Sequence, residues 1–502
     1  MHGPSPDARN DPALAQARHM VLALQYRLQA RLIETHISWV LLDGVHAWKI
    51  KKPVHLPFLD AREAATRRML CEAECALNRR LAPSLYLRVA AITGSFDEPE
   101  LDGAGAVLDH ALCMRQFPDE GLWSNRVAQG LLTLPEVDRL AHRLASFHQA
   151  APSAPPDSPW GTPARRLATW QGTLDGLAAQ PEMARRDSLA TVTAWLSAEA
   201  ERLPPFWQAR HDTGHIREGH GDLHLANLLT LPDGEVTAFD CIEFDPALRW
   251  LDPISDIAFA VMDLAAHGRG DAAWRLLNGW LDHTGDHGAI PGLRAELVHR
   301  AAVRALVSGL HGVQAGAPAS APDYLDVARR FTQAASPSLT ITHGLSGSGK
   351  SHASQRLLQA TGAIRLRADV ERKRLFGLPA HARSADHIPG GIYSADASQR
   401  TYASLISHAE ALLQAGWPVI LDAAFLKRSE RTAARELARR LNVPFSILHC
   451  EAPADVLHAR LTQRAAEGQD PSEADATVLA QQRLWAEPLD EEERLCVVSP
   501  PR

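Results

Sequence analysis

One glycine-rich segment near residue 350 has the residue types and the spacing that bind phosphate groups. It reads GLSGSGKS and matches the pattern G-x-x-x-x-G-K-[ST] at every fixed position. Its glycines let the backbone curl so that successive N–H groups point at phosphate oxygens, while the lysine reaches the β- and γ-phosphates and the final serine can hold Mg²⁺. We therefore predict a nucleoside triphosphate site, in which Lys350 is also catalytic, with these binding residues: Gly344, Ser346, Gly347, Ser348, Gly349, Lys350 and Ser351.

Three groups downstream of this segment fit phosphoryl transfer. Asp369 follows a short predicted strand, where its carboxylate would face an acceptor bound at the strand end, so we predict a catalytic role. Asp422, in the strand-like PVILDAA, is placed either to contact the metal ion through water or to cap the next helix. Arg460 and Arg464 lie four residues apart on one helical face, where they would either clamp phosphate charge from a lid or be solvated.

A second segment with catalytic character reads HGDLHLANLL. Its Asp222 and Asn227 have the D-x-x-x-x-N spacing in which the aspartate accepts the proton of an acceptor hydroxyl and the asparagine binds a metal ion. Asp240 ends the short apolar strand VTAFD, and together with Asn227 it would supply two hard oxygen ligands for Mg²⁺. Asp252 and Asp256 are expected to orient the loop through hydrogen bonds.

Strand and helix patterns must position this second segment. Residues 39–52 look like two short strands around the turn Asp43-Gly44, and residues 62–80 look like a helix. Ala, Leu and Arg recur at helical spacing in three further segments, which are residues 131–148, 163–203 and 271–313. The first part of the chain is therefore predicted to be α+β, with a few strands and a larger helical part.

Short apolar strands alternate with helices in the last third of the chain. The strand-like pieces LTITH, AIRLRA, PVILDAA and FSILHC predict a doubly wound parallel α/β sheet. Two stretches look like joints, since residues 151–159 hold four prolines and residues 315–321 (AGAPASA) open a poorly patterned region. We place the main boundary after the second joint, which gives one domain over residues 1–335 and another over residues 336–502.

Composition narrows the class of protein. The chain has 502 residues, 45% of them hydrophobic and 22% charged, as expected of a folded chain with two or more domains. Its net charge of −7 argues against a broad nucleic-acid or anionic-membrane surface, so the expected partners are small molecules or proteins. Six cysteines without a C-x-x-C pair, and the lack of a long apolar run, predict a cytoplasmic protein without a membrane segment. The oligomeric state stays open.

The second half resembles the small P-loop kinases of the gluconate-kinase, chloramphenicol-phosphotransferase and zeta-toxin group. The resemblance covers about residues 338–502 and rests on GLSGSGKS, the Asp369 segment, PVILDAAF and the arginine-bearing helix. It implies that Asp369 contacts or deprotonates the acceptor hydroxyl and that Arg460 and Arg464 act from a lid.

The first half resembles the aminoglycoside phosphotransferase family, over about residues 30–310, and thereby predicts a bilobal fold like that of protein kinases. HGD stands here in place of the HRD of protein kinases. The resemblance implies that Lys49 binds the α- and β-phosphates, that Glu74 is its helix partner and that ALCMRQF is the hinge for adenine. Lys51 lies on the same strand face as Lys49, and Glu72 is a rival of Glu74, so both alternatives remain open. No G-x-G-x-x-G loop precedes the lysine.

The two halves in this order look like bacterial proteins described as fusions of an aminoglycoside-phosphotransferase-like part with an ATP-binding kinase part. This resemblance implies an ATP-dependent and Mg²⁺-dependent kinase with two nucleotide sites, acting on hydroxyl groups of small molecules. Two alternatives remain: a non-catalytic regulatory protein that binds ATP, and a toxin-like kinase restrained by its N-terminal domain. Residues 160–215 and 265–310 are the expected acceptor region of the first domain.

Overall fold

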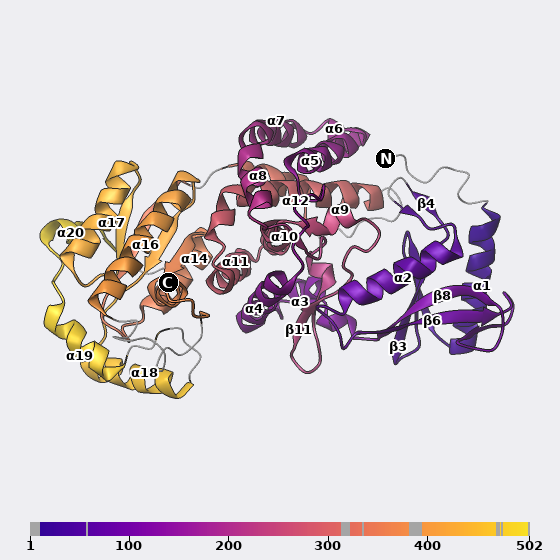
Figure 1. Cartoon of the computed structure of the whole chain (residues 1–502), viewed down its shortest axis with the longest axis horizontal. Helices are drawn as coiled ribbons and strands as arrows, with labels where there is room; N and C mark the ends of the chain where they lie inside the picture. The colour runs from indigo at the N-terminus through magenta and orange to yellow at the C-terminus, as the bar shows by residue number, and fades with distance from the viewer. Residues whose placement is uncertain are drawn as a thin grey trace. The chain divides into compact units, whose positions relative to one another are not determined.

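The computed structural model describes residues 11–56, 59–312, 322–333, 336–380, 394–467, 472 and 475–499 of the chain (Figure 1). The chain forms two compact units. The first consists of Met1–Arg139, Phe147–Asp263 and Glu296–Arg329, and the second of Leu140–Ser146, Leu264–Ala295 and Arg330–Arg502. Within the described ranges, no helix is long and apolar enough to cross a bilayer. The predicted joint at residues 315–321 lies outside the described residues.

The first unit contains a six-stranded antiparallel sheet with the order β1-β2-β3-β8-β6-β7. Its strands are β1 (Arg31–Glu34), β2 (Ser38–Leu42), β3 (His46–Lys51), β6 (Tyr86–Gly94), β7 (Pro99–Leu101) and β8 (Val107–Arg115). Strands β2 and β3 form the predicted pair around Asp43-Gly44, where Gly44 has a φ of 95° that favours glycine. This prediction is confirmed.

Side chains alternate along a strand, so the two faces of β3 lie in different environments. Trp48 and Ile50 are buried with residues of α1 (Pro12–Leu28) in one apolar cluster. Lys49 and Lys51 therefore point to the opposite face of the strand. The sheet also packs against α2 (Ala64–Asn78), the helix predicted over residues 62–80.

The rest of the first unit is mainly helical, as predicted. The helices that lie wholly or partly in it are α3 (Trp123–Ala128), α4 (Leu134–Ala150), α5 (Pro163–Ala178), α6 (Pro181–Ala184), α7 (Asp187–Arg202), α8 (Pro204–Asp212), α9 (Pro246–Arg249), α10 (Pro253–Ala266), α12 (Ile290–Gly312) and α13 (Tyr324–Thr332). Its shorter elements are β4 (His55–Leu56), β5 (Leu59–Asp60), η2 (Asp119–Gly121), β9 (Arg217–Glu218), η3 (Leu225–Asn227), β10 (Leu228–Thr230), β11 (Val236–Ala238) and β12 (Trp250–Leu251).

The second unit contains a five-stranded parallel sheet with the order β14-β15-β13-β16-β17. Its strands are β13 (Leu339–His343), β14 (Ile364–Arg367), β15 (Val419–Asp422), β16 (Phe445–His449) and β17 (Val497–Val498). The four strands predicted in this region are all present. Strand β13 is buried along its whole length, as expected of a strand covered on both faces.

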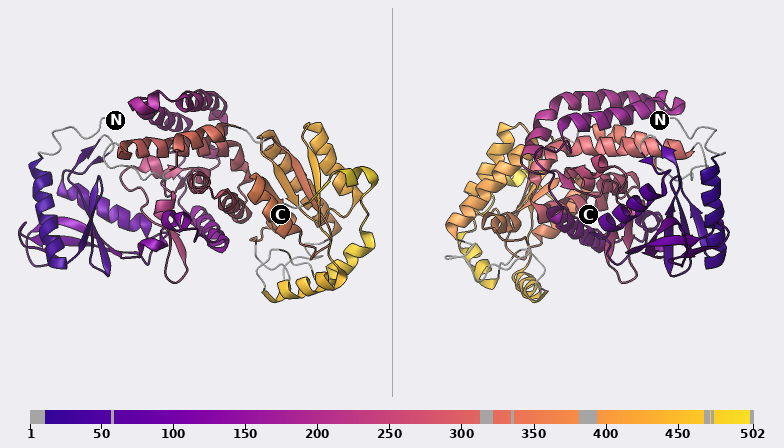
Figure 2. Two further views of the ribbon diagram at one scale, coloured as in Figure 1. Left: turned by 180° about the vertical axis from the view of Figure 1, so that it is seen from behind. Right: turned by 45° about the vertical axis from the view of Figure 1, so that its right-hand side comes forward.

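Helices α14, α16 and α17 pack against this parallel sheet (Figure 2). The helices and the one 3-10 turn that the structure describes wholly in this unit are α11 (Gly270–Thr284), η4 (His287–Ala289), α14 (Lys350–Thr361), α15 (Ala368–Leu375), α16 (Ala395–Gln414), α17 (Arg428–Arg440), α18 (Ala454–Glu467), α19 (Ala476–Trp485) and α20 (Glu491–Leu495). The predicted fold class, an α+β part followed by a parallel α/β sheet, is confirmed.

Candidate active sites

The glycine-rich segment forms a tight loop between β13 and the first turn of α14. Gly344, Gly347 and Gly349 have φ values of 145°, 83° and 96°. Residues that carry a Cβ rarely adopt these positive φ angles. A Cβ at Gly344 would lie only 2.2 Å from the carbonyl oxygen of Cys450, so only glycine fits there. The loop leads directly into the N-terminus of α14. Backbone N–H groups at a helix N-terminus favour a bound anion.

Two described side chains from other helices form hydrogen bonds with the backbone of this loop. Gln482 of α19 accepts a hydrogen bond from the Ser346 N–H at 2.8 Å. Arg460 of α18 donates to the carbonyl oxygen of Gly347 at 3.2 Å. Lys350 itself donates to the Leu345 carbonyl at 2.9 Å. The side chain of Arg464 lies outside the described residues.

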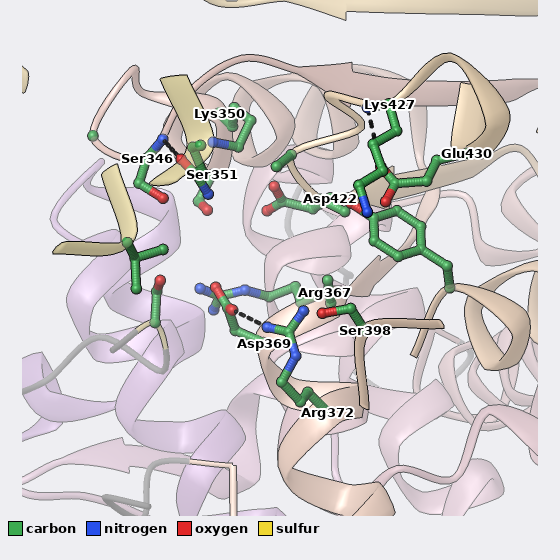
Figure 3. A pocket seen from close by; sticks show the side chains of 18 of the residues that line it. Ser346, Lys350, Ser351, Arg367, Asp369, Arg372, Ser398, Asp422, Lys427 and Glu430 are labelled. Carbon is green, nitrogen blue, oxygen red and sulfur yellow. Dashed lines mark hydrogen bonds and ion pairs between the residues drawn. The ribbon is translucent and has the colours of Figure 1, made fainter. Parts of the chain in front are cut away.

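A cavity of about 480 Å³ brings the predicted residues of this site together, apart from Gly344, Ser348 and Arg464, which are not in its lining. Its lining includes Lys350, Ser351, Asp369, Asp422 and Arg460. Figure 3 shows Lys350, Ser351 and Asp422 along one side of the pocket, with Arg367, Asp369 and Arg372 opposite. A phosphate chain and an acceptor group could therefore meet inside one pocket.

Asp422 lies at the carboxyl end of β15 and is 6% exposed. Its Oδ2 accepts a hydrogen bond from Ser354 Oγ at 2.9 Å. The next helix, α17, has Lys427 at its N-cap, so Asp422 does not cap that helix. The Ser351 hydroxyl and the Asp422 carboxylate are hard oxygen donors that line the same cavity, which fits a Mg²⁺ ion.

Asp369 lies in the first turn of α15, and its Oδ1 accepts a hydrogen bond from Arg372 at 3.0 Å. Burial would raise the pKa of Asp369, but the charges of Arg372, Arg367 and Lys350 and a hydrogen bond from Ser472 hold it below its usual range. The carboxylate is therefore ionised at neutral pH. It can accept a hydrogen bond or a proton from a hydroxyl group in the pocket.

In the first unit, a buried ion cluster joins β3, α2 and the segment after β11. Lys49 Nζ lies 2.7 Å from both Glu74 Oε1 and Asp240 Oδ1. Lys51 Nζ lies 2.6 Å from Glu74 Oε2 and also donates to Glu243. Burial would lower the pKa of Lys49, but Asp240 and Glu74 outweigh that effect and raise the pKa well above its ordinary value. Both lysines are therefore charged.

The rival residues of this cluster have distinct surroundings. Glu72 pairs with Arg68 at 2.8 Å on the exposed side of α2, whereas the Glu74 side chain is fully buried beneath the two lysines. Lys49 and Lys51 both contact Glu74, but it is Lys49 whose Nζ lies 2.7 Å from Asp240 Oδ1. Sequence reasoning missed Glu243, although it lies only three residues after Asp240.

The predicted catalytic loop places Asp222 beside Asn227. Asn227 Nδ2 donates to the Asp222 carbonyl at 3.0 Å and to Asp222 Oδ2 at 3.1 Å, which leaves Asn227 Oδ1 as a ligand atom. Burial would raise the pKa of Asp222, but the charge and hydrogen bond of His224 and the charge of Arg304 hold it far below its usual range. Asp222 is therefore an ionised carboxylate that can accept a proton.

Asp256 and Asp252 hold the backbone and the packing around this loop. Asp256 accepts hydrogen bonds from the His220 N–H at 2.6 Å and from the Gly221 N–H at 2.8 Å. Asp252 pairs with Arg210, with its two carboxylate oxygens at 2.7 and 2.8 Å. Both aspartates are buried, but only Asp256 accepts hydrogen bonds from the loop backbone, whereas Asp252 accepts from Arg210 and from the Ile254 N–H.

Asp240 lies two residues beyond β11, which ends at Ala238 rather than at Asp240 as predicted. The strand is shorter because Asp240 has a φ of 62°, a left-handed conformation that a strand cannot contain. Its N–H donates to the Tyr86 hydroxyl at 3.0 Å, and its carboxylate contacts Lys49. The carboxylate is 44% exposed, and with Asn227 Oδ1 it offers oxygen atoms of the kind that Mg²⁺ binds.

Comparisons with known proteins matched one family model and parts of several solved structures. A family model described as an AAA domain matches residues 339–489. A sugar kinase from Janibacter is 24% identical, covers 32% of this chain and 84% of its own, and has a TM-score of 0.26. A choline kinase from Cryptosporidium parvum is 10% identical, covers 60% of this chain and 86% of its own, and has a TM-score of 0.37.

The relation by sequence extends over most of the chain. Uncharacterized protein Rv2004c from Mycobacterium tuberculosis is 31% identical over 457 residues, which is 90% of this chain and 90% of the relative. The match therefore spans both glycine-rich and HGD-containing parts. The chain belongs to the same protein family as this mycobacterial relative.

Proposed function

We propose that this protein is an ATP-dependent phosphotransferase with two nucleotide sites, each of which transfers the γ-phosphoryl group to a hydroxyl group of a small molecule. The observation that carries the proposal is the pocket in which Lys350 and Ser351 face the ionised carboxylate of Asp369. Simple nucleotide binding does not require a carboxylate opposite the phosphate-binding loop. The proposed domains are residues 1–335 and 336–502, and the proposed location is the cytoplasm.

At the glycine-rich loop, backbone N–H groups and Lys350 bind the phosphates, and Arg460 adds positive charge at the edge of the pocket. Ser351 and Asp422 would hold Mg²⁺, which supplies positive charge beside the β- and γ-phosphates when it is bound. Asp369 aligns the acceptor hydroxyl and accepts its proton. The acceptor oxygen forms a bond to the γ-phosphorus while the bond to the β–γ bridging oxygen breaks, and ADP leaves.

At the HGD loop, Asp222 plays the corresponding role of proton acceptor. Lys49, held between Glu74 and Asp240, binds the α- and β-phosphates. Asn227 and Asp240 would hold the metal ion at this site. The same bonds form and break, because the reaction is again phosphoryl transfer to an alcohol.

The decisive experiment measures ATP turnover by the purified full chain, alone and with pools of sugars, amino alcohols, nucleosides and aminoglycosides. Wild type is compared with Asp222→Asn and Lys350→Ala. Stimulation by one pool that disappears in only one variant supports the proposal and assigns that acceptor class to one site. ATP binding without turnover in any pool counts against it and favours the regulatory alternative.

A further inference from the structure

Four buried polar side chains form a continuous chain that ends at Asp422. Asp282 Oδ2 lies 3.1 Å from Arg365 Nη2, and Arg365 Nη1 lies 3.3 Å from Ser354 Oγ. Ser354 Oγ in turn donates to Asp422 Oδ2 at 2.9 Å. All four residues are less than 9% exposed. We call Asp282, Arg365, Ser354 and Asp422 the buried relay.

The first member of the buried relay comes from a distant part of the sequence. Asp282 lies on α11, which belongs to the same compact unit as the glycine-rich loop although residues 285–343 separate the two in sequence. Figure 1 shows α11 beside α14, and the two helices are in contact. Trp274 of α11 packs on the apolar cluster of Leu358, Ala363 and Ile420.

Close contacts fix the position of α11 along this part of the unit. A Cβ at Gly362, the residue that ends α14, would lie 2.9 Å from the Trp274 ring. Asn278 Nδ2 donates to the Ala363 carbonyl at 3.1 Å, and Asn278 Oδ1 accepts from the Arg365 N–H at 2.7 Å. Asp282, one helical turn further on, is therefore held at the Arg365 guanidinium.

The placement of charges explains why Arg365 needs Asp282. A buried guanidinium is costly unless carboxylates compensate its charge, and the two carboxylates of the relay are Asp282 and Asp422. Asp282 engages Nη2, while Nη1 donates to the Ser354 hydroxyl. That hydroxyl is within hydrogen-bond distance of Asp422 Oδ2, at 2.9 Å, and of the Ser351 carbonyl, at 3.1 Å. Without Asp282, the nearest relay carboxylate for Arg365 would be Asp422 itself, and a direct ion pair would engage the oxygens that a metal ion needs.

We propose that Asp282, Arg365 and Ser354 are positioning residues that keep Asp422 oriented and available as a metal ligand in the glycine-rich site. This inference rests on the proposed function of that site, and it makes α11 part of the site's machinery. Outer contacts of this kind typically change metal affinity by about 10- to 100-fold when they are removed.

The test measures the Mg²⁺ concentration that half-saturates ATP binding to the full chain. All variants carry Lys49→Ala and Asp240→Asn, so that the HGD-loop site does not contribute. We expect Asp282→Asn and Ser354→Ala each to raise the half-saturating Mg²⁺ concentration by about tenfold or more. ATP affinity of Ser354→Ala in EDTA should stay unchanged, because the loop amides, Lys350 and the Arg367–Asp282 ion pair are intact. Asp271→Asn, which removes an acidic side chain from the start of the same helix, is the matched control and should change neither value.

A double variant separates positioning from a purely structural role. In Asp282→Asn/Arg365→Gln the Arg365 guanidinium no longer competes for Asp422, so the Mg²⁺ dependence should return toward that of the background protein. This variant removes the charge of Arg365 together with that of Asp282, so it keeps the test usable if Asp282→Asn alone does not fold. Unchanged Mg²⁺ dependence in Asp282→Asn and Ser354→Ala, or further weakening in the double variant, would overturn the inference.

Lys350→Ala in the same background distinguishes the two proposals. If this variant binds ATP as well as the background protein does, the proposed nucleotide site itself is wrong. If Lys350→Ala loses binding while the relay variants keep their Mg²⁺ dependence, only the buried relay is wrong.

Discussion

Glu74 accepts a hydrogen bond from Lys49 at 2.7 Å through Oε1, on a carboxylate that solvent does not reach. Its other oxygen accepts from Lys51, so one carboxylate serves two lysines. Burial would raise the pKa of Glu74, but Lys49 and Lys51 lower it to about 2. The carboxylate of Glu74 therefore remains charged. Because Lys49 and Lys51 both contact it, substitution of each lysine in turn can separate their contributions to activity and to stability.

Lys49→Met and Lys51→Met should have different consequences. Lys49 also contacts Asp240, so we expect its loss to lower kcat/KM for ATP at the HGD-loop site by about 10²-fold or more. Lys51→Met leaves Glu243 without its buried cation, so we expect mainly a loss of stability, about 3 kcal/mol. Steady-state kinetics in a Lys350→Ala background and thermal unfolding measure the two effects. Equal loss of kcat/KM in both variants would contradict the distinction.

Asp369→Asn should lower turnover at the glycine-rich site without weakening ATP binding. The amide keeps the size of the side chain but cannot accept a proton, and loss of a general base typically costs about 10²- to 10⁴-fold in rate. Turnover with the stimulating acceptor pool is measured in an Asp222→Asn background, and ATP binding is measured by calorimetry. A variant with normal turnover would show that Asp369 is not the proton acceptor.

Asp256→Asn should disturb the HGD loop from outside the pocket. Asp256 accepts from two successive N–H groups, and an amide in its place would turn an NH₂ group toward one of these donors. We expect kcat at that site to fall while KM for ATP changes little, and the free energy of unfolding to fall by about 1–3 kcal/mol. Glu235→Gln, at the exposed end of the β10–β11 turn, serves as the control. A rise in KM with unchanged kcat would argue against a role in orienting Asp222.

The second unit should lose stability on mild acidification because of His287. Burial lowers the pKa of His287 to about 4, and neither ring nitrogen has a hydrogen-bond partner among the described residues. The unfolded chain binds a proton near pH 6.5, but the folded protein resists protonation until about pH 4. The free energy of unfolding should therefore fall between these values, by about 3 kcal/mol in all.

Thermal unfolding of His287→Gln from pH 7 to pH 4 checks this expectation. The substitution removes the titrating group, so the dependence of the unfolding free energy on pH should become shallower. His458→Gln, at an exposed position of α18, is the matched control and should keep the slope of the wild type. A His287→Gln slope equal to that of the wild type would rule out the buried imidazole as its source.

The elements around both motifs could be predicted because their signals are local. Apolar runs such as LTITH are long enough to identify buried strands, and the turn at Asp43-Gly44 identifies a strand pair. Periodicity could not separate Lys49 from Lys51, since both face one side of β3 and both contact Glu74. The end of β11 was predicted wrongly because nothing in the sequence around Asp240 indicates its left-handed φ.

The contacts made by α11 could not be predicted for a different reason. Asp282 and Arg365 are 83 residues apart, and each reads as an ordinary charged residue of its own element. Only the packing of α11 against α14 brings them together. Ser354 left a weak signal, since it lies three residues after Ser351 and the two side chains therefore share one face of α14.

The side chain of Asn278 has a consequence for how the protein can be divided. Strand β14 is one of the two edge strands of the parallel sheet. Asn278 forms hydrogen bonds with the carbonyl of Ala363, just before the strand, and with the Arg365 N–H on the side away from β15. A fragment that starts at residue 338 lacks Asn278, so the backbone groups of Ala363 and Arg365 would have no hydrogen-bond partner from α11. A strand from another copy of the fragment could then pair with this exposed edge. We therefore expect this fragment to aggregate. A fragment that starts at residue 264 retains α11, which covers the edge strand, and should aggregate less.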